Sequence, residues 1–245
     1  MRNFGLIGKT LQHSFSKQFF TEKFKNENIQ AQYDLFELND INEFSHLTKE
    51  IEFSGLNVTI PYKEQIIPFL DEIDPTAKAI GAVNTIKFCH SNGTQSLCGY
   101  NTDIIGFTDS LLPDLKPYHK KALILGTGGA SKAIQYSLQQ LGIDTIFVSR
   151  TKKEDILCYE DINKDILSDH LLIINCSPAG MFPNIDSAPN IPYNLLTNKH
   201  YLFDLVYNPE NTLFCQLGKE HGAITKNGLD MLYGQAVASW KIWNK

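Results

Sequence analysis

The feature that most constrains this chain is a glycine turn that follows an apolar run. Residues 121–130 read Lys-Ala-Leu-Ile-Leu-Gly-Thr-Gly-Gly-Ala, and a helical pattern over 130–141 follows at once. A strand, a glycine turn and a helix in this order bring backbone N–H groups and a helix N-terminus to face a pyrophosphate. The turn therefore predicts a dinucleotide-binding unit. Its cofactor-binding residues would be Gly126, Thr127, Gly128, Gly129 and Ala130.

The next apolar run, 145–149, ends in Ser149-Arg150-Thr151. A dinucleotide-binding unit presents its ribose-reading residue at this place, and an NAD site would have Asp or Glu there. Arg150 could be an ordinary surface arginine, but its guanidinium is also suited to pair with a 2′-phosphate. We therefore predict NADP(H) as the cofactor. The predicted phosphate cradle consists of Ser149, Arg150, Thr151 and Lys153.

The composition argues against several classes of protein. The 245 residues carry a net charge of −5, which gives no broad signal for nucleic-acid binding. The five cysteines show no Cys-x-x-Cys spacing and the seven histidines form no close pair, so no metal site is expected. No apolar span reaches membrane length, and the N-terminus opens into a strand-like segment rather than a signal peptide. We expect a cytoplasmic protein without a membrane or nucleic-acid partner.

Apolar strands alternate with helical patterns along the chain, which favours an α/β fold with a parallel sheet covered on both sides. The predicted strands are 4–8, 33–38, 55–60, 121–125, 145–149, 171–175 and 201–206. The predicted helices are 17–26 with Ser16 as its cap, 65–70 opened by Pro61, one from Ile104 towards Pro113, 130–141 and 229–240. Segments 82–89 and 95–99 flank Ser91-Asn92-Gly93, which is typical of a hairpin.

The segment after Arg150 does not fit a standard dinucleotide-binding fold. Only Thr-Lys-Lys-Glu-Asp stands between Arg150 and the strand-like run 156–159. A parallel crossover normally takes a dozen or more residues, usually including a helix. Either the crossover helix is missing, or 156–159 is not an adjacent parallel strand.

Several polar residues stand where the predicted elements begin or end. Lys63 could be a solvated helix lysine or, if partly desolvated, a proton-transfer group. Asp103 could simply be a favourable acid at a helix N-terminus. Ser14 and Ser16 are equally ambiguous: Ser16 could cap a helix, and hydroxyl groups at a helix start also suit a carboxylate ligand.

At these clusters the sequence resembles the shikimate dehydrogenase family along nearly its whole length. The resemblance rests on segments that occur in the family's order. They are His13-Ser14-Phe15-Ser16, Asn57-Val58-Thr59-Ile60-Pro61-Tyr62-Lys63, Gly81-Ala82-Val83-Asn84-Thr85, Gly99-Tyr100-Asn101-Thr102-Asp103, the glycine turn, Ser149-Arg150-Thr151, 175–181, Asp204-Leu205-Val206-Tyr207-Asn208-Pro209 and 227–235.

The resemblance implies a two-domain α/β enzyme with its active site in the cleft between the domains. Residues 1–102 with 228–245 would form the substrate-binding domain, and 103–227 a Rossmann-like NADP-binding domain. The short segment after Arg150 leaves open whether this domain lacks one crossover helix. The implied reaction is the reversible NADPH-dependent reduction of 3-dehydroshikimate to shikimate. This reaction belongs to the shikimate pathway, which leads to chorismate and the aromatic amino acids. The implied oligomeric state is a monomer or a homodimer.

The resemblance also implies residue roles. Lys63 and Asp103 would form the proton-transfer pair. Ser14, Ser16 and Tyr207 would hold the substrate carboxylate, while Thr59, Asn84, Asp103 and Gln235 would bind the ring hydroxyls. Leu205 and Gly228 would contact the cofactor.

Two departures from the family pattern bear on these roles. Lys17-Gln18-Phe19-Phe20 follows Ser16 in place of Pro-x-x-His-Asn, and Ser149 replaces the usual Asn of the phosphate motif. The second change predicts weaker selectivity for NADP. The alternatives are an NAD-dependent quinate/shikimate dehydrogenase, disfavoured by Arg150, and a ligand-binding regulator without turnover, disfavoured by Lys63 and Asp103.

Overall fold

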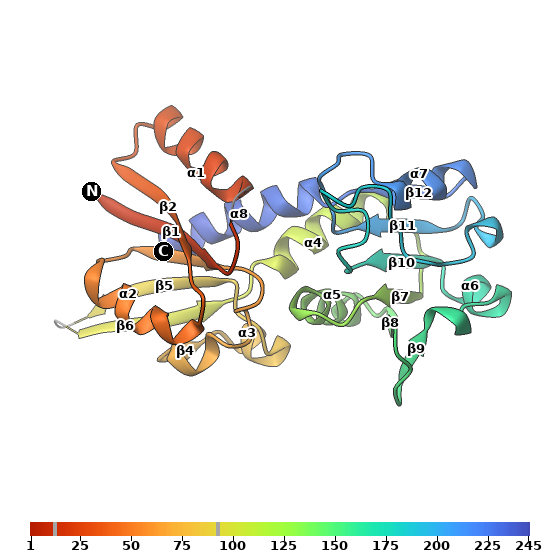
Figure 1. Ribbon diagram of the computed structural model, residues 1–245, viewed down its shortest axis with the longest axis horizontal. Helices are drawn as coiled ribbons and strands as arrows, with labels where there is room; N and C mark the ends of the chain where they lie inside the picture. The colour runs from red at the N-terminus through yellow and green to blue at the C-terminus, as the bar shows by residue number, and fades with distance from the viewer. Residues whose placement is uncertain (12–13, 92–93) are drawn as a thin grey trace. The chain divides into compact units, whose positions relative to one another are not determined.

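The computed structural model describes residues 1–11, 14–91 and 94–245 of the chain (Figure 1). They form two compact units, 1–102 with 235–245 and 103–234. Each unit contains a six-stranded sheet, and we describe each by itself. No helix in these residue ranges is long and apolar enough to cross a membrane.

The first unit has a mixed sheet in the order β2-β1-β3-β5-β6-β4. Its strands are β1 (Arg2–Gly8), β2 (Ala31–Glu37), β3 (Gly55–Val58), β4 (Glu72–Ile73), β5 (Thr85–Ser91) and β6 (Thr94–Tyr100). Strands β2, β1 and β3 are parallel, whereas β5 pairs antiparallel with both β3 and β6. The predicted hairpin is thus confirmed, although the Asn92-Gly93 part of its turn lies outside the described residues.

Helices cover both faces of the first sheet. They are α1 (Phe15–Asn26), α2 (Phe44–Glu50), α3 (Pro75–Ile80) and the second part of α8 (Leu229–Trp243). Alternate residues of β1 enter different cores: Phe4 and Leu6 pack with Phe20 of α1 and Trp243 of α8, whereas Ile7 packs with residues of α2 and α3. Burial on both faces of the sheet explains why residues 4–7 of β1 form a run without polar side chains.

The second unit has a fully parallel sheet in the order β12-β11-β10-β7-β8-β9. Its strands are β7 (Lys121–Leu125), β8 (Asp144–Ser149), β9 (Ile156–Cys158), β10 (Leu172–Asn175), β11 (Tyr201–Asp204) and β12 (Ile224–Lys226). In chain order this is the doubly wound arrangement 3-2-1-4-5-6, in which the order reverses between β7 and β10. The parallel sheet predicted for the nucleotide-binding region is confirmed.

Both faces of the second sheet are also buried. Its helices are α4 (Asp103–Leu111), α5 (Gly129–Gln140), α6 (Lys164–Asp169), α7 (Leu213–Glu220) and the start of α8. Ala122 and Ile124 of β7 pack with α4, α5 and α8, whereas Leu123 and Leu125 pack with α6 and α7. The α4 helix begins one residue before the predicted start, at Asp103.

The structure resolves the problem after Arg150 in favour of a missing helix. Strand β9 pairs parallel with β8, with Phe147 opposite Ile156, although only residues 150–155 connect them. The chain reverses in a tight turn in which Lys153 and Ile156 exchange backbone hydrogen bonds and Asp155 has φ 61°. The expectation that a parallel connection here needs a dozen residues was wrong, because this turn replaces the helix.

Two predicted helical features differ from the structure. Segment 65–70 forms only a short 3-10 helix, Ile67–Phe69, since Pro68 lacks the N–H that an α-helix needs and restricts Ile67. Pro61 does not open a helix; it follows Ile60 through a cis peptide bond. Ser14, not Ser16, occupies the N-cap of α1, and Ser16 lies buried within the helix.

Candidate active site

The glycine turn of the second unit leaves the N-terminus of α5 uncovered by side chains. Gly126 has φ 111°, and a Cβ there would lie 3.2 Å from backbone atoms of Cys176 and Ser177. Gly128 is the N-cap, so it makes no side-chain cap, and no acidic residue occupies the first turn. The first N–H groups of a helix lack partners within the helix and attract anions. The turn therefore fits a pyrophosphate.

The turn lies at the switch point of the sheet. Strands β7 and β10 are neighbours, and the Cys176 amide donates to the Leu125 carbonyl at 2.9 Å. Open parallel sheets bind ligands at the carboxyl ends of their strands where the order reverses. The predicted cofactor residues Gly126, Thr127, Gly128, Gly129 and Ala130 are brought together at this place.

Arg150 lies just beyond the carboxyl end of β8, with its side chain exposed. The Ser149 hydroxyl accepts from the Thr151 amide at 3.2 Å and donates to the Thr151 carbonyl, which fixes the backbone around Arg150. Lys152 forms an ion pair with Asp161 at 3.0 Å, and Lys153 is exposed. An exposed guanidinium on a fixed turn fits the 2′-phosphate of NADP.

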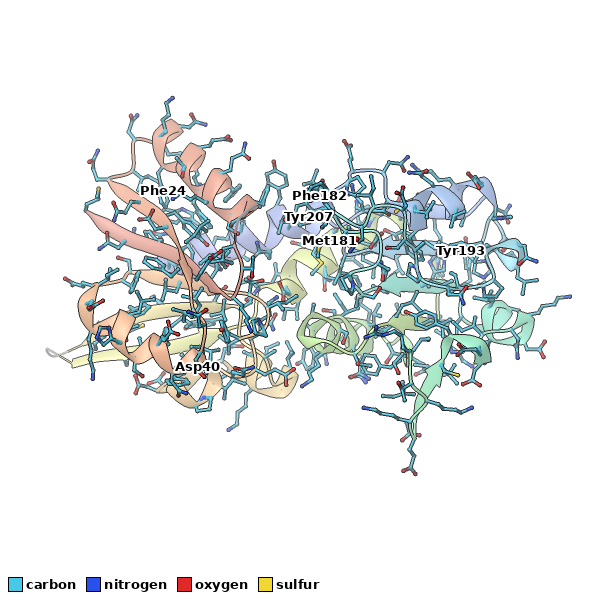
Figure 2. All side chains as sticks on the ribbon, in the orientation of Figure 1. Phe24, Asp40, Met181, Phe182, Tyr193 and Tyr207 are labelled. Carbon is cyan, nitrogen blue, oxygen red and sulfur yellow. The ribbon has the colours of Figure 1, made fainter. Side chains whose placement is uncertain are left out.

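Leu205 and Gly228 are also neighbours in the second unit. The Gly228 amide donates to the Val206 carbonyl, and a Cβ on Gly228 would lie 2.2 Å from the Leu205 carbonyl oxygen. Only glycine permits this approach, which brings the segment before α8 against the end of β11. Figure 2 shows Met181, Phe182 and Tyr207 in the same region, where the Phe182 amide donates to the Asn208 carbonyl at 3.0 Å.

Asp204 is a buried carboxylate that orders these loops and was not singled out from the sequence. One of its oxygens accepts from Asn175 Nδ2 at 2.9 Å and from the Val206 amide at 3.0 Å. The other accepts from the Thr212 hydroxyl at 2.6 Å. Asn175 in turn accepts from the amide and hydroxyl of Ser177. An acid at the end of an otherwise apolar parallel strand is the sequence signal that could have revealed it.

Burial outweighs these hydrogen bonds and raises the pKa of Asp204 to about 6. Because the folded state then binds this proton more tightly than the unfolded chain, rising pH lowers the stability contributed by Asp204. From about pH 4 to about pH 7 the loss amounts to about 2 kcal/mol, at ~1.4 kcal/mol per pKa unit.

We therefore expect the destabilisation caused by Asp204→Asn to shrink by about 2 kcal/mol from about pH 4 to about pH 7, because Asn does not titrate. Urea unfolding of both proteins across this range measures the effect. Asp186→Asn, at an exposed loop position, controls for the loss of one charge. A difference between Asp204→Asn and wild type that does not vary with pH would contradict the raised pKa.

In the first unit, backbone contacts bring together three of the predicted substrate-site residues. Thr59 follows β3, and a Cβ on Gly8 at the end of β1 would touch its methyl group. The Val83 amide donates to the Lys63 carbonyl at 2.7 Å, and the Val58 amide donates to the Asn84 carbonyl at 2.9 Å. Thr59, Lys63 and Asn84 thus cluster at the carboxyl end of β3.

The two predicted serines occupy the start of α1. Ser14 Oγ is buried, and it has no hydrogen-bond partner among the described residues. Ser16 is 9% exposed. A buried hydroxyl without a partner at a helix N-terminus is costly unless a ligand satisfies it, so Ser14 fits a carboxylate ligand.

The remaining predicted residues divide between the units. Asp103 is the first residue of α4 and Tyr207 follows β11, both in the second unit. Gln235 lies in the part of α8 that belongs to the first unit. Asp103 and Gln235 are buried, and burial raises the pKa of Tyr207. The pairing of Lys63 with Asp103 stays a prediction, since the two residues belong to different units. No cluster of potential metal ligands occurs in the described ranges.

A doubly wound parallel sheet with a glycine turn at its switch point defines the class of dinucleotide-binding α/β proteins. The model of the shikimate dehydrogenase substrate binding domain matches residues 6–86. One relative is named shikimate dehydrogenase (NADP(+)) and comes from Carboxydothermus hydrogenoformans. It is 38% identical to this chain, and the match covers 98% of this chain and 90% of the length of the relative. The chain belongs to the shikimate dehydrogenase family.

Solved structures agree with this membership. Shikimate dehydrogenase from Aquifex aeolicus has 34% sequence identity and a TM-score of 0.86, covering 100% of this chain and 92% of its own. The Thermus thermophilus enzyme, solved with NADP(H) and shikimate, has 27% identity and a TM-score of 0.86, covering 99% of this chain and 93% of its own.

Proposed function

We propose that this protein catalyses the reversible, NADP-dependent interconversion of shikimate and 3-dehydroshikimate. The observation that carries the cofactor assignment is the exposed Arg150 at the end of β8, where an NAD site would have an acid. Relatives of this protein are named shikimate dehydrogenase (NADP(+)), a name that states both the activity and the cofactor. The reaction belongs to the shikimate pathway, and a cytoplasmic location and a monomeric or dimeric state are part of the same proposal.

The residues that would hold NADP lie in the second unit. The uncapped N-terminus of α5 faces the pyrophosphate, and Arg150 pairs with the 2′-phosphate, supported by Ser149, Thr151 and Lys153. Leu205 and Gly228 contact the cofactor beyond the end of β11. When bound, NADPH supplies the hydride that the reduction requires.

Lys63 and Asp103 provide the proton. As the ketone carbon of 3-dehydroshikimate gains a hydride, its oxygen becomes negative and needs one proton to become the hydroxyl of shikimate. Lys63 gives this proton and stabilises the developing charge, with Asp103 as its partner in the proton transfer. In the reverse direction Lys63 takes the hydroxyl proton.

The substrate is held by polar side chains, of which Asp103 also belongs to the proton-transfer pair. Ser14 and Ser16, with Tyr207, bind the carboxylate, which supplies the missing partner of Ser14 Oγ. Thr59, Asn84, Asp103 and Gln235 bind the ring hydroxyls and orient the ring. Holding both reactants in a fixed geometry supplies much of the remaining acceleration.

A steady-state assay of the purified protein with shikimate or quinate, each with NADP⁺ or NAD⁺, tests the proposal. We expect the highest kcat/KM for shikimate with NADP⁺, because Arg150 can pair with the 2′-phosphate. Absence of turnover with every pair would indicate a ligand-binding protein. A preference for NAD⁺ or for quinate would overturn the cofactor or the substrate assignment.

A further inference from the structure

A buried polar cluster in the first unit surrounds Asn84, and its other members are used by none of the steps above. It consists of Asn57 on β3, Asn84 and Thr85 at the start of β5, Thr102, and Ser239 on α8. All of these side chains are buried, and Thr85, Thr102 and Ser239 are each 0% exposed. We call it the Asn57 cluster. Polar side chains this deep in a domain are costly unless they are hydrogen-bonded to one another.

The cluster fixes which way the Asn84 amide points. The backbone N–H of Thr102 lies 2.7 Å from Asn84 Oδ1. Since a backbone N–H can only donate, the atom facing it must be the oxygen and not the nitrogen of the amide. The hydroxyls of Thr102 and Thr85 donate to the same oxygen, each at 3.1 Å. The Asn84 side chain is therefore fixed through its Oδ1 atom, and its NH2 group points away from the Thr102 amide.

Thr85 and Ser239 stabilise this orientation of the Asn84 amide. Their hydroxyl oxygens are 2.8 Å apart, and Asn57 Nδ2 donates to Thr85 at 3.2 Å and to Ser239 at 3.0 Å. With Thr85 donating to Asn84, the single hydrogen of Ser239 is available to Thr85 or to the Gln235 carbonyl, which lies 2.9 Å away one turn earlier on α8. Removing one hydroxyl leaves buried polar neighbours without a hydrogen-bond partner, which is unfavourable.

The Asn57 cluster also includes Tyr33 of β2. The Tyr33 hydroxyl donates to Asn57 Oδ1 at 2.8 Å. Asn57 donates at one end of its amide and accepts at the other, so it cannot rotate without losing both sets of partners. Asn84 is thus the residue of the proposed substrate site that this buried network holds.

We propose that Thr85 and Ser239 are positioning residues that hold Asn84 with its NH2 group as the donor to an oxygen of the substrate ring. The inference rests on the proposed function, which makes Asn84 a substrate ligand. Neither residue touches the substrate in this assignment. They act by preventing the Asn84 amide from turning over and presenting its oxygen.

The test compares Thr85→Val with Thr85→Ser. Valine keeps the size of threonine and removes the hydroxyl, whereas serine keeps the hydroxyl. We expect Thr85→Val to raise the KM for shikimate about tenfold, the equivalent of ~1.4 kcal/mol, with the KM for NADP⁺ and kcat changed less than about twofold. Thr85→Ser is expected to restore the KM for shikimate to near the wild-type value.

Ser239→Ala provides a second variant, and Ser137→Ala its matched control. Both serines are buried in helices, but Ser137 Oγ has no partner among the described residues. Only Ser239→Ala should raise the KM for shikimate. An unchanged KM in Thr85→Val and Ser239→Ala, an equal loss for both substrates, or no rescue by Thr85→Ser would each overturn the inference. Failure of the proposed function itself would appear differently, as wild-type protein that does not oxidise shikimate.

Discussion

Lys63→Ala is expected to lower kcat for shikimate oxidation by about a hundred- to ten-thousandfold, the range typical of losing a general acid–base group. The proton that leaves the substrate hydroxyl would have no positioned acceptor, and the charge on the oxygen would lose its neighbouring ammonium. Steady-state kinetics with saturating shikimate and NADP⁺ measure the loss.

The NADP⁺ dissociation constant should stay near the wild-type value in this variant, because the residues proposed to hold the cofactor are elsewhere in the chain. Lys78→Ala is the matched control, since Lys78 is an exposed lysine on α3 of the same unit. It should retain full activity. If Lys63→Ala kept the wild-type kcat, Lys63 would be a solvated lysine and not the proton-transfer group.

Arg150→Ala is expected to raise the KM for NADPH by about ten- to a hundredfold, as the loss of a charge-assisted hydrogen bond of ~1.5–3 kcal/mol requires. The KM for NADH should change little, because NADH has no 2′-phosphate. The measurement is the ratio of kcat/KM for the two cofactors in wild type and variant.

Lys152→Ala removes one positive charge from the same turn between β8 and β9 and serves as the control. The Lys152 ammonium is already paired with Asp161 at 3.0 Å, so we expect a much smaller effect on NADPH. Equal losses with NADPH and NADH in Arg150→Ala would show that Arg150 supports the turn after β8 rather than the phosphate.

The sequence predicts well where local pattern and local chemistry coincide. The glycine turn, the strands on either side of it and the hairpin of the first unit could all be placed, because each depends on neighbouring residues. The 3-10 helix at Ile67–Phe69 shows the limit of this reasoning: the apolar spacing of 65–70 is helical, but Pro68 prevents the helix. Ser14 and Ser16 are two residues apart, and the sequence alone could not decide which one caps α1.

Long-range polar contacts could not be predicted. Asn57 and Ser239 are hydrogen-bonded although they are separated by 182 positions. Asn57 stands in a segment that carries the family resemblance, but no local pattern links it to Ser239. The Asp204 cluster is likewise assembled from loops that follow different strands. The pairing of Lys63 with Asp103 depends on two separate units of the chain, and it stays a prediction from the family resemblance.

Strand β9, which the chain reaches without a crossover helix, lies at one edge of the second sheet. An edge strand offers unpaired backbone groups to any other chain that could extend the sheet. The exposed ladder is short, because β9 spans only Ile156–Cys158, and the other edge, β12, spans only Ile224–Lys226. The turn before β9 carries Lys152, Lys153, Glu154 and Asp155. Short edges flanked by charge resist intermolecular strand pairing, so the shortened domain stays protected against aggregation without a covering helix.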